Sequence, residues 1–329
     1  MKKQLMAAVI LGCILPAMLA FGVGLVVGRE TPHPEASIPE APSRPTEAAP
    51  PPMVSDYDQR TVISVELDGG SREEMELGQY LTRVLLAEMP AEFEPEALKA
   101  QAVVARTYTC RRLAGKKHGM AAVCTDPSCC QGCRREADYL EAGGRAEAVE
   151  KIRQAVRDTD GQVLTYEGAL IDATYFSCSG GFTEDAVAVW GQDVPYLQAV
   201  ESPGEEMAPR FREEVRFTRQ ELAEKLGLSG QEGEALAIGS IRRTQGGGIE
   251  TVQIGGRQFS GRELRQKLGL RSTALEIRQE GGQIVFESRG FGHRVGMSQY
   301  GAQAMALEGR GYAEILSHYY QGTALEVRR

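Results

Sequence analysis

Four cysteines and one histidine crowd into a single short stretch of the chain, where they could bind a metal ion. His118 and Cys124 are followed closely by Cys129, Cys130 and Cys133. Closely spaced cysteine and histidine are more typical of a metal site than of a disulfide framework. We therefore predict a metal bound through His118, Cys124 and Cys130, with Cys133 or Cys129 as the candidate fourth ligand. The alternative is a Cys124–Cys129 or Cys130–Cys133 disulfide, which an oxidising compartment would permit.

The same stretch lacks the signatures of catalytic zinc. A nucleobase deaminase needs H-x-E and P-C-x-x-C, but His118 is followed by Gly-Met, and Pro127 by Ser-Cys. The H-E-x-x-H motif of zinc peptidases is absent from the sequence. A metal here is therefore predicted to be structural, stapling a loop that has little apolar content of its own.

A glycine-rich segment, Gly290–Gly296, is the second stretch that could approach a ligand. Glycine at this density lets the backbone pass close to a ligand or to another segment of the chain. It is not a phosphate-binding loop, because the Lys-Ser/Thr ending of that motif is missing.

The elements that would position these residues follow from the spacing of apolar residues and from helix-ending signals. Pro90 ends one predicted helix and Pro95 begins the next, while Glu167-Gly168 suits the turn of a hairpin. Folded structure is predicted to begin near Arg60. The predicted elements are a strand at Val62–Leu67, helices at Leu77–Glu88, Pro95–Leu113 and Arg145–Arg157, a loop at Lys116–Arg134, and hairpin strands at Gln162–Tyr166 and Ala169–Phe176.

An internal repeat marks the second half of the chain. Phe217–Leu228 is echoed by Phe259–Leu270, and both copies place Thr or Ser three residues before Glu, which is the capping-box signature of a helix start. We interpret the repeat as part of a small inserted α/β subdomain at about 205–280 that serves stability and spacing. A strand at Gln283–Phe286 and helices at Ser298–Leu307 and near Tyr312–Tyr320 are predicted after it.

The N-terminus has the pattern of a membrane anchor. Lys2 and Lys3 precede an apolar run, Leu5–Val27, which is long enough to span a bilayer. A cleaved signal peptide is the alternative, but its apolar region is usually shorter. Residues 1–29 are therefore predicted to be a cytoplasmic tip and a single transmembrane helix, with everything after it outside the cytoplasm. Residues 30–58, rich in Pro, Ala and Glu, are predicted to be an extended linker.

Composition excludes several classes of protein. Charged residues at 25% and hydrophobic residues at 42% are ordinary globular values, which exclude a wholly disordered chain, collagen and a coiled coil. The 37 Lys and Arg against 45 Asp and Glu give a net charge of -8, so nucleic acid is not an expected partner. Together with the predicted elements, this indicates an α+β fold at 60–329, with long helices, hairpins and the small inserted subdomain.

Four ordered blocks of sequence carry a resemblance to a known family. The blocks are Leu85–Pro90 with Pro95–Tyr108, His118 with Val123–Pro127 and Cys130, Ser177 with Ser179–Gly181 and Thr183-Glu184, and Gly290–Ala302 with Tyr319–Thr323. In these blocks, and in the membrane anchor that precedes them, the chain resembles the stage II sporulation protein D family. Two positions depart from the family pattern: Arg294 stands where Gly is usual, and Cys178, which could pair with Cys110, replaces Thr or Asn.

The resemblance implies an activity and its partners. It implies a lytic transglycosylase that cleaves the β-1,4 bond after N-acetylmuramic acid in denuded peptidoglycan strands and leaves a 1,6-anhydro end. It implies a structural Zn2+ on His118, Cys124 and Cys130. It also implies a stage II sporulation protein P-type amidase and other engulfment membrane proteins as partners, and septal wall remodelling during sporulation. Two alternatives remain: a noncatalytic peptidoglycan-binding tether and a zinc-dependent wall amidase.

One carboxyl group is implied as the catalytic acid and base. Glu88 matches the family's catalytic position, at the end of the predicted helix Leu77–Glu88. The negative end of the helix dipole and apolar neighbours in sequence should raise its pKa. The polar residues expected to line the sugar groove are Arg106, Ser177, Ser179, His293 and Gln299.

Overall fold

The computed structural model describes residues 55–67, 69–113, 115, 118–119, 121–209, 211–229 and 236–329. The predicted anchor and nearly all of the predicted linker lie outside these residues. Within them, no helix combines the length and the apolar character needed to cross a membrane. Helices and strands are mixed along the chain, which confirms the α+β prediction.

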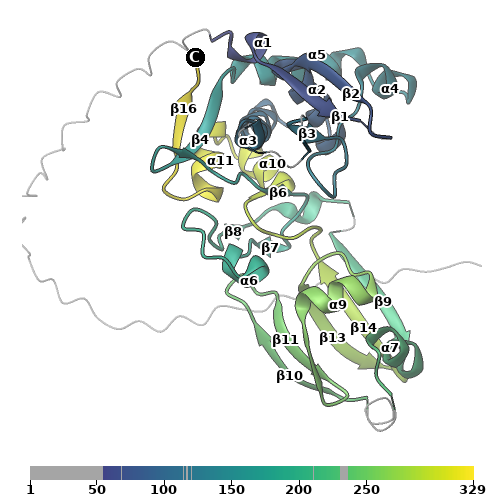
Figure 1. The fold of residues 1–329 in the computed structure, drawn as a ribbon. Coiled ribbons are helices and arrows are strands. Elements are labelled where there is room, and N and C mark those ends of the chain that lie inside the picture. The colour runs from purple at the N-terminus through teal and green to yellow at the C-terminus, as the bar shows by residue number, and fades with distance from the viewer. Residues whose placement is uncertain are drawn as a thin grey trace, which may run out of the picture. The chain divides into compact units, whose positions relative to one another are not determined.

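A central helix organises the first hydrophobic core. α3 is buried on nearly every face, because small Ala and Val side chains let neighbouring helices approach it from several sides. α2, α5, α10 and α11 all contact it (Figure 1). The helices around this core are α1 (Tyr57–Arg60), α2 (Leu77–Glu88), α3 (Pro95–Leu113), α4 (Glu136–Glu141), α5 (Ala146–Asp158), α6 (Ala186–Trp190), α10 (Gln299–Leu307) and α11 (Tyr312–Tyr319), with a short 3-10 turn, η1 (Glu205–Met207).

The helix predictions are confirmed where local signals were strong. α2 and α3 have the predicted bounds, and α5 is displaced by one residue from its prediction. α1 and α4 were not predicted, because they are short and mostly polar and carry no apolar period. The predicted start of folded structure, near Arg60, therefore lies slightly too far along the chain, since α1 already starts at Tyr57.

Small sheets surround the first core. β1 lies between antiparallel β2 and parallel β3, and β4 lies between β16 and β5. The predicted hairpin turn is confirmed, with positive φ at both Glu167 and Gly168. Its second strand is broken into β5 and β6, and β6 pairs elsewhere, with β15. The strands are β1 (Val62–Glu66), β2 (Arg72–Glu76), β3 (Val123–Cys124), β4 (Gln162–Tyr166), β5 (Ala169–Leu170), β6 (Tyr175–Phe176), β7 (Gly181–Phe182), β8 (Glu201–Ser202), β15 (Met297–Ser298) and β16 (Ala324–Val327).

A second hydrophobic core is formed by residues between Phe217 and Phe286. Its two sheets have the strand orders β13-β14-β9 and β10-β11-β12. Both predicted capping boxes are present, at Thr218 before α7 and at Ser260 before α9, and the two helices contact each other. The elements are β9 (Arg212–Thr218), α7 (Arg219–Leu226), β10 (Ile238–Arg243), β11 (Ile249–Ile254), β12 (Arg257–Ser260), α9 (Gly261–Leu268), β13 (Ala274–Glu280) and β14 (Gln283–Arg289).

Candidate active site

A cavity of about 490 Å³ brings together residues that are far apart in the sequence. Glu88 comes from the end of α2, Ser177 follows β6, His293 belongs to the glycine-rich segment and Gln299 begins α10. Four of the residues named from the sequence therefore share one cavity. The other lining residues are Tyr108, Pro127, Cys130, Ala173, Thr174, Tyr175, Phe176, Arg265, Phe291 and Gly292.

Glu88 is the single carboxyl group among the lining residues. It is the last residue of α2, because Met89, which precedes a proline, adopts extended geometry with ψ of 143°. Burial raises the pKa of the Glu88 carboxyl, while hydrogen bonds from the Gly132 backbone and the Tyr175 hydroxyl oppose that rise. The net upward shift agrees with the direction expected from the sequence and suits a proton donor.

The loop that carries the cysteines also touches Glu88. The backbone N–H of Gly132 donates to Glu88 Oε1 at 2.5 Å. A Cβ at Gly132 would lie 2.9 Å from that oxygen and 3.2 Å from Ala87 Cβ, so glycine permits this close approach. The position of Glu88 therefore depends on the order of this loop.

A buried amide supports the same carboxyl group through a tyrosine. Gln131 donates from Nε2 to Thr109 Oγ1 at 3.1 Å, and its Oε1 accepts from the Tyr175 hydroxyl at 3.3 Å. Because a hydroxyl has one proton, Tyr175 can donate either to the ionised Glu88 carboxylate or to Gln131, and in the second case it can accept from protonated Glu88. The sequence analysis missed Gln131, Gly132 and Tyr175, and their residue types carried no signal that could have identified them.

His293 contacts two aromatic rings, that of Phe176, which also lines the cavity, and that of Trp190, which does not. Its ring centroid is 5.5 Å from that of Phe176 and 5.4 Å from that of Trp190. Its Nδ1 accepts from the backbone N–H of Val295 at 3.1 Å, which leaves the proton on Nε2. Burial, aided by the charge of Arg265, lowers the pKa of His293 to about 4. His293 is therefore neutral near pH 7 and is not the acid of this cavity.

Gln299 lines the cavity and has a buried side-chain donor without a partner among the described residues. Its side chain is 5% exposed, and Nε2 has no hydrogen-bond partner among the described residues. An unsatisfied buried amide is costly, so an acceptor from a ligand would stabilise it. Ser177 lies beside α10, because its backbone oxygen accepts from Tyr300 N at 3.0 Å.

Two of the expected groove residues lie elsewhere. Arg106 is fully buried, and its Nε donates to Asp58 Oδ1 at 2.8 Å, so it forms an internal ion pair. Ser179 is also fully buried, and its hydroxyl donates to Glu205 Oε2 at 2.8 Å. Neither residue is among those that line the cavity, so the structure lends no support to the prediction that they contact sugar, which stays a prediction. Both side chains bind buried carboxylates, those of Asp58 and Glu205, and nothing in the sequence indicated that these would lie beside them.

The predicted metal ligands lie together near this cavity. The ligand atoms of His118, Cys124, Cys129 and Cys130 all lie within 4.8 Å of one another. His118 Nε2 is 3.2 Å from Cys130 Sγ and 3.7 Å from Cys129 Sγ, close to the about 3.3–3.8 Å between donors that tetrahedral zinc bond lengths imply. The donor set therefore fits a metal ion, with Cys129 rather than Cys133 as the fourth ligand.

The described cysteines form no disulfide with one another. No disulfide joins Cys110, Cys124, Cys129, Cys130, Cys133 or Cys178. Cys110 contacts the Tyr57 hydroxyl, whereas Cys178 Sγ donates to Glu205, so the Cys110–Cys178 pairing suggested by the sequence is not formed. Cys130 is at once a member of the metal cluster and a lining residue of the cavity.

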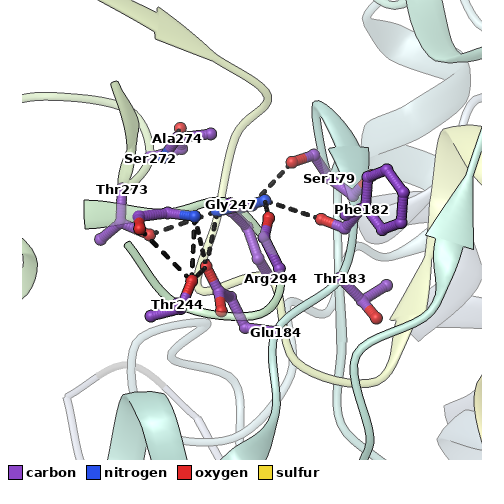
Figure 2. A network of polar contacts seen from close by, with 12 residues as sticks. Ser179, Phe182, Thr183, Glu184, Thr244, Gly247, Ser272, Thr273, Ala274 and Arg294 are labelled. Atoms are coloured by element: carbon purple, nitrogen blue, oxygen red, sulfur yellow. Dashed lines mark hydrogen bonds and ion pairs between the residues drawn. The ribbon is translucent and has the colours of Figure 1, made fainter. Parts of the chain in front are cut away.

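Arg294 adopts the left-handed conformation that its glycine-rich surroundings suggest, with φ of 69°. Its guanidinium is 1% exposed and binds Glu184 Oε1 at 2.8 Å. Figure 2 shows it surrounded by acceptors from several segments of the chain. Nε donates to Ser179 O at 2.7 Å, and Nη2 donates to Phe182 O at 2.8 Å and to Gly246 O at 2.7 Å. These bonds offset the backbone strain that a non-glycine residue has at positive φ.

The same network reaches the connection between β10 and β11. Glu184 Oε1 also accepts from Thr244 Oγ1 at 2.9 Å and from Gly248 N at 3.1 Å (Figure 2). A Cβ at Gly248 would collide with Glu184 and lie 2.9 Å from Arg294 Nη1, so this backbone can approach only as glycine. One buried ion pair thus joins Phe182–Glu184, the segment of His293 and the connection at Thr244–Gly248.

A family model and two relatives that match most of the chain carry closely similar descriptions. A family model described as "Stage II sporulation protein" matches residues 69–166. The chain is 40% identical to the stage II sporulation protein D of Bacillus amyloliquefaciens over 77% of this chain and 74% of that protein. It is 40% identical to the protein of the same name from Bacillus subtilis over 78% of this chain and 76% of that protein. The amidase enhancer of Bacillus subtilis is 28% identical over 74% of this chain and 40% of that protein.

Proposed function

The chain belongs to the stage II sporulation protein D family, and from this premise we propose that it is a peptidoglycan lytic transglycosylase. The substrate would be a glycan strand, cleaved at the β-1,4 bond between N-acetylmuramic acid and N-acetylglucosamine. The observation that carries the proposal is a cavity with a single, partly buried carboxyl group of raised pKa, Glu88. Ordinary glycoside hydrolases need two carboxyl groups, one of which activates water or attacks the sugar.

One carboxyl group is enough when the sugar supplies its own nucleophile. Protonated Glu88 gives its proton to the glycosidic oxygen as the bond from that oxygen to C1 of N-acetylmuramic acid breaks. The 6-hydroxyl of the same sugar attacks C1 and forms the 1,6-anhydro ring, and its proton passes to the Glu88 carboxylate. The acid is then restored, and no water is consumed. Gly132 and Tyr175 hold the carboxyl group in place throughout.

The products decide between this activity and the alternatives. Denuded glycan strands treated with the protein should give fragments whose new ends are lighter by one water than hydrolysis products, measured by mass spectrometry. Hydrolytic ends would contradict the proposal. Co-sedimentation with sacculi without any released fragment would favour the noncatalytic tether.

We propose that the metal is zinc and that its role is structural. Four protein donors complete a tetrahedral site, which leaves no open position for the water that a zinc amidase would need. His118, Cys124, Cys129 and Cys130 would hold the ion, and the ion would supply a fixed cross-link for the loop. Cys130 and Gly132 of that loop reach the cavity and Glu88. Zinc would therefore order one wall of the active site.

Cys124→Ser should abolish stoichiometric zinc binding and lower the thermal midpoint, because binding of structural zinc is coupled to folding. Elemental analysis and thermal unfolding with and without a chelator measure both effects. Cys133→Ser is the matched control, since Cys133 is close in sequence but outside the cluster, and it should retain the metal. Native protein without zinc, or equal loss in both variants, would count against the site.

We also propose the setting that the sequence suggested. The chain would be a single-pass protein of the cell membrane with a cytoplasmic N-terminus and an extracytoplasmic catalytic domain, acting in septal wall remodelling and engulfment. Its partners would be a stage II sporulation protein P-type amidase, which strips stem peptides, and other engulfment membrane proteins. Support comes from the relatives named for sporulation and from the one named amidase enhancer. Extraction from membranes by salt alone, without detergent, would contradict the anchor.

A further inference from the structure

An arginine from the second core reaches the cavity that contains Glu88. Arg265 lies on α9, whose buried residues Gly261, Leu264 and Leu268 pack into the second core. Its own side chain is partly exposed and lines the cavity together with Glu88 and His293. The sequence analysis assigned this part of the chain to stability and spacing. The position of Arg265 shows that it also contributes to the cavity wall.

The Arg265 guanidinium has no partner in the part of the chain that the structure describes. Among the described residues, no hydrogen bond or ion pair involves its side chain, and burial alone lowers its pKa. No ion pair joins it to Glu88 among the described residues, and Glu88 Oε1 accepts instead from the Gly132 N–H. The two fully buried arginines behave differently, since Arg106 binds Asp58 and Arg294 binds Glu184.

An unpaired, partly desolvated cation in a binding cavity favours an anionic ligand group. Removing an arginine from water is costly unless a carboxylate or phosphate binds it, and its planar guanidinium suits carboxylate through two parallel hydrogen bonds. Glu88, the single acid that lines the cavity, is bound elsewhere. The expected partner is therefore a carboxylate of the substrate.

We propose that Arg265 binds the free lactyl carboxylate of N-acetylmuramic acid and thereby selects glycan strands without stem peptides. This assignment rests on the proposed function, because it takes the substrate to be a peptidoglycan strand. In such a strand the lactyl carboxyl is ionised when no peptide is attached, whereas a stem peptide converts it to a neutral, bulky amide. The two forms thus differ in the charge that Arg265 can recognise. Arg265 is a specificity-determining residue, and the proton transfers belong to Glu88.

Binding to a protein that cannot cleave tests the assignment. The probes are oligosaccharides from denuded strands, with the lactyl carboxylate either free or converted to a methylamide, and the protein is the Glu88→Gln variant of the full chain. The free acid should bind about 10- to 100-fold more tightly than the methylamide, as expected for a charge-assisted hydrogen bond. Higher salt should reduce this ratio.

Variants of α9 separate charge recognition from folding. Adding Arg265→Gln should reduce the ratio of the two affinities to about one, mainly by weakening the binding of the free acid. Arg265→Lys should give an intermediate ratio, because lysine keeps the positive charge but lacks the two parallel N–H donors of the guanidinium. Arg262→Gln, on the same helix but exposed and outside the cavity, should keep the full ratio.

The possible failures can be distinguished. A ratio that survives in Arg265→Gln, or an equal loss of both forms in that variant, overturns the assignment, and so does absence of preference in the starting protein. Anhydro products from the wild-type chain, together with no preference for the free acid, would contradict the assignment of Arg265 and leave the transglycosylase proposal standing. A binding preference that depends on Arg265, with no anhydro products, would instead contradict the transglycosylase and leave the assignment standing.

Discussion

Replacement of Glu88 by Gln should leave folding and glycan binding intact while anhydro-sugar formation falls by at least about 10²–10⁴-fold, the usual contribution of a general acid and base. Gln keeps the shape of the side chain, and its oxygen can still accept from the Gly132 N–H. It cannot give or take a proton. Among the described residues, no second carboxyl group lines the cavity. His293, with a pKa of about 4, is neutral near pH 7, and its remaining N–H is too weak an acid to take over the role.

The raised pKa of Glu88 gives this prediction a pH dependence. The reaction begins with the protonated carboxyl group, so wild-type kcat/KM should fall as pH rises through the raised pKa. A carboxyl whose folded-state pKa is raised stabilises the fold at low pH, and that stabilisation is lost as pH rises through the folded pKa. At higher pH the buried charge is a cost that Gln does not carry. The variant should therefore be at least as resistant to urea as wild type at neutral pH.

A matched control separates chemistry from charge. Glu92 is exposed, lies four residues after Glu88 and does not line the cavity. Glu92→Gln makes the same chemical change and should leave anhydro-product formation unaltered. If Glu88→Gln instead turned over at a near-normal rate, Glu88 would lose its assigned role, and another group would have to supply the proton.

Arg294→Met should lower the free energy of unfolding by about 3–5 kcal/mol, the usual cost of stranding a buried charge. Both Arg294 and Glu184 have side chains that are 1% exposed, so water cannot replace the guanidinium. Met has a similar length and meets the same backbone cost at a φ of 69°. The loss therefore reports the ion pair and its hydrogen bonds. Urea denaturation of the purified protein measures it.

An exposed ion pair of the same length is the control. Arg242 Nη2 and Glu250 Oε1 are also 2.8 Å apart, but these side chains are 67% and 42% exposed. Arg242→Met should cost at most about 1 kcal/mol, because surface pairs are screened by solvent. Adding Glu184→Gln to Arg294→Met should recover part of the stability, since it removes the stranded charge. Equal losses in the free energy of unfolding for Arg294→Met and Arg242→Met would show that burial does not make the Arg294–Glu184 pair more important for stability.

Local signals in the sequence determined the helices that carry the chemistry. Pro90 and Pro95 restrict the backbone next to them, so the end of α2 and the start of α3 could be placed. The two capping boxes act over three residues and were equally readable. The metal cluster was predictable for the same reason, because all four of its members lie within a short stretch of chain.

Tertiary structure decided which distant side chains meet. Arg106 and Arg265 are both arginines on predicted helices, yet Arg106 is held by Asp58, 48 residues away, and Arg265 is left facing the cavity. Arg294 finds Glu184 across 110 residues of sequence. Such pairings depend on how whole helices and sheets pack, and neither spacing nor local propensity contains that information. The sequence could therefore supply Glu88, through the family resemblance, and three of the candidate metal ligands. The choice of Cys129 over Cys133, the walls of the cavity and the partner of each buried charge were settled only by the fold.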